Sequence, residues 1–359
     1  MNWDKEIFIN KTRIAFDAPV YFIADIAANH DGNLSRAKDL IWLAKESGAD
    51  CAKFQHFIAE KIVSDFGFKN LKTHQSHQST WKKSVFKVYK EYECKRDWTS
   101  ELAETAKKAE IEFMTTPYDF EILSEIDNYV NAYKIGSGDI TWHEFLKKIA
   151  RLNKPVLLAC GASDINEVKA AVEVITKINK KIVLMQCNTN YTASLENFKY
   201  INLNVLKTFA KEFPNMVLGL SNHTAGCSTV LGAVALGARV IEKHFTDNNS
   251  RTGPDHKFAM NPETWKEMVE RTRELELALG DGVKRVEENE KDTVIVQRRC
   301  LRLKNDLKKG DVISESDIEI LRPAPENSFP PYEVEKVTGK KLNSDKKAGD
   351  AFYKGEIEG

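Results

Sequence analysis

Eight short apolar segments alternate with stretches of helical period through the first two-thirds of the chain, and this alternation limits the fold more than any other feature. The apolar segments are Tyr21–Ala27, Cys51–Phe54, Glu112–Thr115, Ala132–Ile135, Val156–Ala159, Ile182–Gln186, Val217–Leu220 and Arg239–Ile241. Helical stretches between consecutive strands imply that the strands pair in parallel. Eight such strands predict a closed (β/α)8 TIM barrel, class α/β, rather than an open sheet.

Polar side chains cluster at the carboxyl ends of these strands, where a (β/α)8 barrel carries its active site. His223 and His244 stand at equivalent positions after consecutive strands. Two neutral imidazoles with open coordination positions favour a site for a divalent metal that also holds substrate. The alternative is that each histidine caps its strand and bonds only to backbone, and the repetition of the pair weighs against it.

A second group at the same rim combines ammonium and hydroxyl donors, which suit an anionic ligand. Its members are Lys53, Thr116, Lys134, Ser137 and Ser221. A lone lysine at a strand end is more often a surface ion pair, but five donors on one rim favour an anion site. The turn at residues 136–138 adds backbone N–H groups. Gln55, Thr189 and Tyr191 are further candidates for substrate contact at this rim.

Three carboxylates, Asp25, Asp139 and Asp255, are candidates for orienting water or moving protons near the metal. The sequence does not choose among them. For Asp255 the alternative is a turn residue that follows Pro254.

The long connection after the second strand carries His74 and His77 and several aromatic residues. The two histidines have ligand-like spacing but lack a third ligand nearby, so we expect a solvated loop or lid. The aromatic residues are Trp81, Phe86, Tyr89, Tyr92 and Trp98. We expect these side chains to pack the insertion rather than to form a platform for sugar.

Composition argues against several kinds of binding partner and says little else about function. The 359 residues carry 53 basic and 53 acidic side chains, so we expect neither a nucleic-acid nor a membrane partner. The charged N-terminus lacks the apolar core of a secretory signal, and the apolar stretch at residues 231–240 is too short to span a bilayer. Six cysteines without CxxC spacing indicate reduced thiols and a cytoplasmic location.

The pattern changes after the helical segment at residues 261–280. We expect a barrel domain at residues 1–282, a charged linker at 283–297 and a small β-rich domain at 298–359. Similar turns at Lys309–Asp311 and Lys347–Asp350 suggest a pseudo-repeat within the last domain. A module of that size buries little apolar area alone and is usually supported by docking onto something larger.

Several ordered motifs together resemble the sialic acid synthase family over nearly the whole chain. They are FIADIAANHDGN, GADCAKFQ, KIGSGD, GLSNHT, EKHFT, GPDHKFAMNPETW and the C-terminal RRCLRL, KKGDVI and LRP. The resemblance implies a phosphoenolpyruvate-dependent nonulosonic acid synthase, with a (β/α)8 barrel and a small SAF domain similar to type III antifreeze protein. The anion site would then hold phosphoenolpyruvate, and the metal would activate the aldehyde of an N-acetylated hexose.

The resemblance also implies roles for individual residues. The metal would be Mn2+ or Mg2+, with Asp255 close to it and to the amino sugar. Gln55 and Tyr191 would touch the sugar. In the family a domain-swapped homodimer places each SAF domain over the partner's barrel, so Arg322 would hold the substrate acetamido group in trans.

Three departures from the family pattern leave the sugar open. Asp25 stands where glutamate is common, Ala159 and Cys160 replace Ser-Thr, and Asn222 replaces an aspartate beside the first histidine. The substrate could therefore be N-acetylmannosamine or a diacetamido-trideoxyhexose precursor of legionaminic or pseudaminic acid. Two other functions compete: a 3-deoxy-ulosonate-phosphate synthase acting on a phosphorylated aldose, which has no SAF domain, and a non-catalytic carbohydrate- or ice-binding protein.

Overall fold

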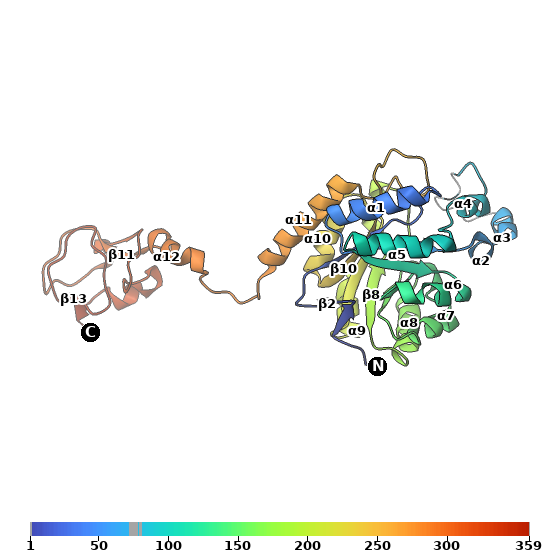
Figure 1. The fold of residues 1–359 in the computed structure, drawn as a ribbon. Helices are drawn as coiled ribbons and strands as arrows, with labels where there is room; N and C mark the ends of the chain where they lie inside the picture. Colours follow the sequence, from blue (N-terminus) through green and yellow to red (C-terminus); the bar gives the residue numbers. More distant parts are fainter. Residues whose placement is uncertain (1, 72–77, 79–80, 359) are drawn as a thin grey trace. The chain divides into compact units, whose positions relative to one another are not determined.

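The eight predicted strands pair in chain order and close into a barrel, with the last strand beside the first (Figure 1). This computed structural model describes residues 2–71, 78 and 81–358. The barrel strands are β3 (Tyr21–Asp25), β4 (Cys51–His56), β5 (Glu112–Pro117), β6 (Tyr133–Ile135), β7 (Val156–Ala159), β8 (Ile182–Cys187), β9 (Val217–Asn222) and β10 (Ala238–His244). All of their pairings are parallel, so the predicted (β/α)8 barrel is confirmed.

Helices surround this barrel (Figure 1). They are α1 (Leu34–Glu46), α5 (Thr99–Lys108), α6 (Phe120–Ile126), α7 (His143–Ala150), α8 (Ile165–Thr176), α9 (Val205–Glu212), α10 (Ser228–Ala235) and α11 (Pro262–Leu279). Between β4 and α5 an insertion forms α2 (Ala59–Ile62), α3 (Asp65–Asn70) and α4 (Val85–Glu91). His74 and His77 lie outside the described residues. Among the residues described, no helix is long and apolar enough to cross a membrane.

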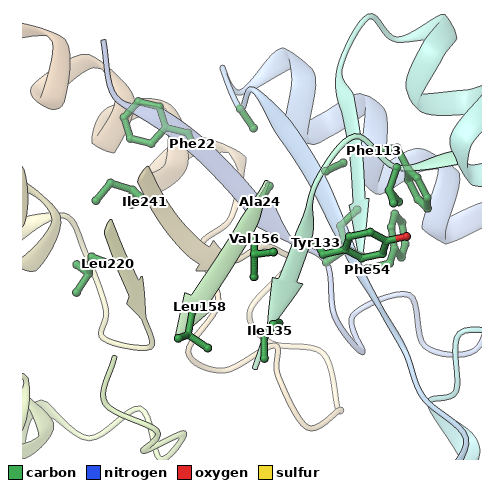
Figure 2. Packing of buried hydrophobic residues seen from close by; sticks show 14 of the residues in the cluster. Phe22, Ala24, Phe54, Phe113, Tyr133, Ile135, Val156, Leu158, Leu220 and Ile241 are labelled. Carbon is green, nitrogen blue, oxygen red and sulfur yellow. The ribbon is translucent and has the colours of Figure 1, made fainter. Parts of the chain in front are cut away.

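Strand alternation divides the barrel side chains into two apolar clusters. Outward residues such as Phe22, Phe54 and Ile241 pack with the helices (Figure 2). Inward residues such as Ile23 and Met114 form a second cluster inside the barrel. The N-terminal hairpin of β1 (Glu6–Ile9) and β2 (Thr12–Ala15) adds three isoleucines to that inner cluster and closes one end. Toward the opposite end of the barrel, the next inward-facing positions of the strands carry polar side chains.

Six of the eight strand ends differ from the prediction, and those of β3, β9 and β10 bear most on which way side chains point. β9 and β10 continue through Asn222 and His244, beyond the expected ends at Leu220 and Ile241. Residues 242–244 thus belong to a strand and alternate between its faces. β3 stops earlier, at Asp25, because Ala27 turns into the left-handed region with φ of 45°.

The chain divides into two compact units between Gly280 and Asp281. The second contains α12 (Lys291–Gln297), β11 (Cys300–Leu303), β12 (Ile318–Leu321), β13 (Lys341–Leu342) and β14 (Ile357–Glu358). Its own small core includes Leu301, Ile313 and Phe352. The two predicted turns use the same hydrogen bond, since the backbone N–H groups of Lys308 and Lys347 each donate to an aspartate three residues later.

Replacing Gly219 by alanine should destabilise the barrel. A Cβ atom there would lie 2.7 Å from the carbonyl oxygen of Val240, so the strands must shift, at a cost of about 1–3 kcal/mol. Gly138→Ala is the control, because its Cβ would meet no atom within 4 Å. All six tryptophans precede Gly280, so tryptophan fluorescence during thermal unfolding reports on the barrel. Equal midpoints for the two variants would contradict the packing at Gly219.

Candidate active site

Two buried lysines project into the barrel above its apolar filling, and each is paired with a carboxylate. Lys53 Nζ lies 2.8 Å from Asp25 Oδ2, and Lys134 Nζ lies 2.6 Å from Glu242 Oε1. Burial acts to lower the pKa of Lys53, but Asp25 and Glu242 outweigh it and raise that pKa. Burial likewise opposes ionisation of Glu242, yet Lys134 and Lys53 lower its pKa to about 2. The barrel therefore holds fixed charges of both signs.

Hydroxyl groups complete this polar layer. Lys53 Nζ donates to Thr116 Oγ1 at 3.2 Å, and Lys134 Nζ to Ser221 Oγ at 3.4 Å. Ser137 Oγ accepts from the Gly161 N–H at 2.9 Å. All five predicted anion-binding residues line one inner cavity of about 40 Å³, together with Asp25, Gln55, Tyr191, both histidines and Glu242. The structure thus brings together residues from six strands at one rim.

His223 and His244 lie beside this layer, with ring centroids 5.3 Å apart. Burial lowers the pKa of each to about 3, so both imidazoles are neutral at physiological pH and have lone pairs to offer. His244 Nδ1 is buried without a hydrogen-bond partner and lies 3.6 Å from Asp255 Oδ2. The described residues contain no group of three or more His, Cys, Asp or Glu side chains spaced to hold a metal. The two neutral imidazoles are groups that suit a divalent ion, whose other coordination positions would then be filled by water or substrate.

Asp255 is the carboxylate best placed to exchange a proton near neutral pH. Burial raises its pKa to about 7, although the Ala28 N–H that donates to Oδ2 acts in the opposite direction. Asp25 faces the same histidine, with 3.7 Å between its Oδ2 and His244 Nε2. Despite being shorter than glutamate, Asp25 also accepts from Gln55 Nε2 at 3.0 Å.

A second, outer cavity of about 160 Å³ shares Gln55, Tyr118, Tyr191 and His244 with the inner one. Its other lining residues are Ala28, Phe57, Gln78, Trp81, Val88, Tyr89, Tyr92, Pro254 and Asp255. Tyr89 packs against Phe57 and Trp81, as expected for aromatic residues of the insertion, and Trp81, Tyr89 and Tyr92 also line this outer cavity. The sequence did not show that α4 faces the rim.

Some predicted residues stay apart from these cavities, and one important residue was missed. Asp139 and Thr189 line neither cavity, although burial raises the pKa of Asp139 to about 6. Arg322 is exposed in the second unit, just after β12. Glu242 was not predicted, because the expected strand ended at Ile241. Its spacing of two residues from His244 was the available signal.

The fold and this site define a (β/α)8 barrel with a charged, polar cavity at the carboxyl ends of its strands, where barrels of this kind carry their active sites. Comparison with known protein families shows which family the chain belongs to. The sequence profile of the NeuB family matches residues 40–284, and that of the SAF domain matches residues 298–358. The chain therefore belongs to the NeuB family, and it is a phosphoenolpyruvate-dependent synthase.

Similarity to individual proteins extends over most of the chain. The N,N'-diacetyllegionaminic acid synthase of Campylobacter jejuni is 37% identical over 327 residues, which cover 89% of this chain and 94% of that protein. The pseudaminic acid synthase of the same species is 32% identical, with 95% and 98% covered. The crystal structure of the Bacillus subtilis spore coat polysaccharide biosynthesis protein spsE has a TM-score of 0.66 at 30% identity, with 98% and 99% covered.

The raised pKa of Asp255 predicts a pH-dependent stability difference between the metal-free protein and Asp255→Asn. The folded state holds a proton on Asp255 up to about pH 7, whereas the unfolded state releases it near 3.8, so wild type loses stability as pH rises between these values. Asparagine does not titrate, and its oxygen can still accept from the Ala28 N–H. Relative to the variant, wild type should lose on the order of 2 kcal/mol between pH 5 and pH 8. Unfolding that shows a constant difference across this range would contradict the raised pKa.

Proposed function

We propose that this chain condenses phosphoenolpyruvate with the aldehyde of an unphosphorylated N-acetylated hexose, giving a nine-carbon sialic-acid-type nonulosonic acid and phosphate. The observation that carries the proposal is the pair of adjoining cavities. The inner one has two buried ammonium groups, and the outer one has neutral and aromatic walls. His244 lies where they meet. The names of the relatives support a product of this type.

Phosphoenolpyruvate suits the inner cavity because it carries a phosphate and a carboxylate. Lys53 and Lys134 would supply charge-assisted hydrogen bonds, and Thr116, Ser137 and Ser221 would add hydroxyl contacts. The carboxylates of Asp25 and Glu242 already compensate both lysines, so the barrel can bury them before substrate arrives. Phosphoenolpyruvate would then bind to lysines that already have carboxylate partners.

The outer cavity suits a sugar without phosphate. None of its described lining residues is lysine or arginine, and it contains the carboxyl group of Asp255. A sugar phosphate would therefore bring a dianion to a cavity whose described lining residues from this chain include no cation. The human N-acetylneuraminate-9-phosphate synthase, a relative of 29% identity, carries a phosphate in the name of its product. The same reasoning disfavours a 3-deoxy-ulosonate-phosphate synthase. N-acetylmannosamine and a diacetamido-trideoxyhexose both remain compatible with the cavity.

His223 and His244 would hold Mn2+ or Mg2+, which when bound supplies Lewis-acid polarisation of the aldehyde oxygen. Lys53 and Lys134 would orient phosphoenolpyruvate so that its C3 forms the new bond to the aldehyde carbon. Water then adds at C2, and the C2–O bond to phosphate breaks. Asp255 and Asp25, on the two sides of His244, would orient that water and move its proton.

A panel of sugars tests the proposed substrate class. Phosphoenolpyruvate consumption should be faster with N-acetylmannosamine or a diacetamido-trideoxyhexose than with N-acetylmannosamine 6-phosphate. The expected difference in kcat/KM between N-acetylmannosamine and its phosphate is about 10-fold or more, since a charged group would lack its partner. A preference for the phosphorylated sugar, or consumption independent of any sugar, would overturn the proposal.

The metal role predicts that activity needs a divalent ion. His223→Ala and His244→Ala should each abolish turnover, and chelation of the wild type should be reversed by Mn2+ or Mg2+. Imidazole pairs suit several metals, so the ligand type does not select one. Full turnover after exhaustive chelation would contradict the proposed role of the metal.

We further propose a domain-swapped homodimer in which Arg322 completes the partner's site, and a cytoplasmic location that suits its six unpaired cysteines. Mixing Arg322→Ala protomers with His244→Ala protomers should restore part of the activity. One site of the heterodimer would then combine an intact barrel with an intact arginine. No recovery despite demonstrated subunit exchange would show that the SAF domain does not act in trans.

A further inference from the structure

Lys243 is a buried lysine that the proposed chemistry does not use. It lies between Glu242 and His244 on β10, so strand alternation turns its side chain away from the cavities and toward the start of α10. Only 1% of its surface is exposed. An ammonium group buried this deeply is costly unless its surroundings compensate it.

Burial lowers the pKa of Lys243 to about 7, and oxygen atoms of one short segment accept the hydrogen bonds of its side chain. Lys243 Nζ donates to Asn222 Oδ1 at 2.6 Å and to the carbonyl oxygen of Thr224. Within the described part of the chain, no carboxylate forms an ion pair with it; the pairs found there involve other lysines. The amide of Asn222 also accepts from the Thr224 N–H and Oγ1, at 3.1 and 2.8 Å. One lysine therefore ties together the residues on both sides of position 223.

The residue between them is His223. Its Nδ1 lies 2.9 Å from the carbonyl oxygen of Asn188, so Nδ1 carries the proton when that bond forms and the lone pair is on Nε2. The ring is thus oriented from one side by Asn188. Its backbone is fixed from the other side by Lys243, through Asn222 and Thr224.

We propose that Lys243 is a positioning residue that fixes the Asn222–Thr224 loop so that His223 presents Nε2 to the metal. This inference rests on the metal role proposed above. Without the ammonium group, Asn222 Oδ1 loses one donor and the Thr224 carbonyl loses the donor that the structure shows for it. The loop would then be free to move the imidazole, while the phosphoenolpyruvate-binding lysines on β4 and β6 keep their own partners.

Two separate binding measurements on the chelated full-length protein test this inference. Mn2+ binding is measured by electron paramagnetic resonance, and phosphoenolpyruvate binding without metal by calorimetry. Lys243→Met should weaken Mn2+ binding by about 10- to 100-fold, the usual effect of losing a residue that orients a ligand. Phosphoenolpyruvate affinity should stay within about 3-fold, because Lys53 and Lys134, which would make the charged contacts, lie on β4 and β6 and keep their own carboxylate partners.

Two further variants separate positioning from general destabilisation. Thr272→Val removes a buried hydrogen bond within α11, remote from this loop in the chain, and should leave Mn2+ affinity unchanged. Asn222→Ala removes the acceptor while keeping Lys243, and should weaken Mn2+ binding in the same direction even if Lys243→Met fails to fold.

The outcomes are distinct. If wild type binds no Mn2+, the metal role fails and this inference fails with it. If wild type binds Mn2+ and both loop variants bind it equally well, only the inference about Lys243 is overturned. Parallel losses of Mn2+ and phosphoenolpyruvate affinity would also overturn it, because they indicate general disruption of the rim.

Discussion

Two buried ion pairs, Lys53 with Asp25 and Lys134 with Glu242, allow this barrel to keep cations in its interior. An unpaired ammonium at these positions would cost several kcal/mol, and the strands around it would have to open to water. On these strands, one inward-facing side chain is apolar and the next inward-facing one, two residues further along, is charged. The polar rim therefore lies directly above the apolar core of the barrel.

The ion pairs also set the difference in charge between the two cavities. Among the described lining residues, lysines occur only in the inner cavity, and the outer one has aromatic, amide and carboxyl groups. The two neutral histidines stand at the boundary, with Asp25 and Asp255 on either side of His244. This arrangement supports the proposal that an anion with a nucleophilic carbon and an uncharged aldehyde are held side by side, as a condensation needs.

The sequence predicted the barrel and most of the site because both depend on short-range pattern. Eight strand-helix alternations specify the fold, and the rim rule then places residues such as Lys53, Lys134 and His223 together. The misses came from strand ends and from tertiary placement. Three further residues at the end of β10 continue the strand, and their alternation decides that Glu242 and His244 face the site and that Lys243 does not. Trp81, Tyr89 and Tyr92, in and beside α4, reach the cavity only through the path of an insertion that has no periodic signal.

The central claim is that the paired lysines form the phosphoenolpyruvate site, and a calorimetric titration tests it most directly. Phosphoenolpyruvate should bind Lys134→Met about 10- to 150-fold more weakly than wild type, since one charge-assisted contact is lost. Lys38→Met, which removes a lysine paired with Glu101 at the surface, is the matched control and should bind like wild type. Equal affinity of Lys134→Met and wild type would contradict the account.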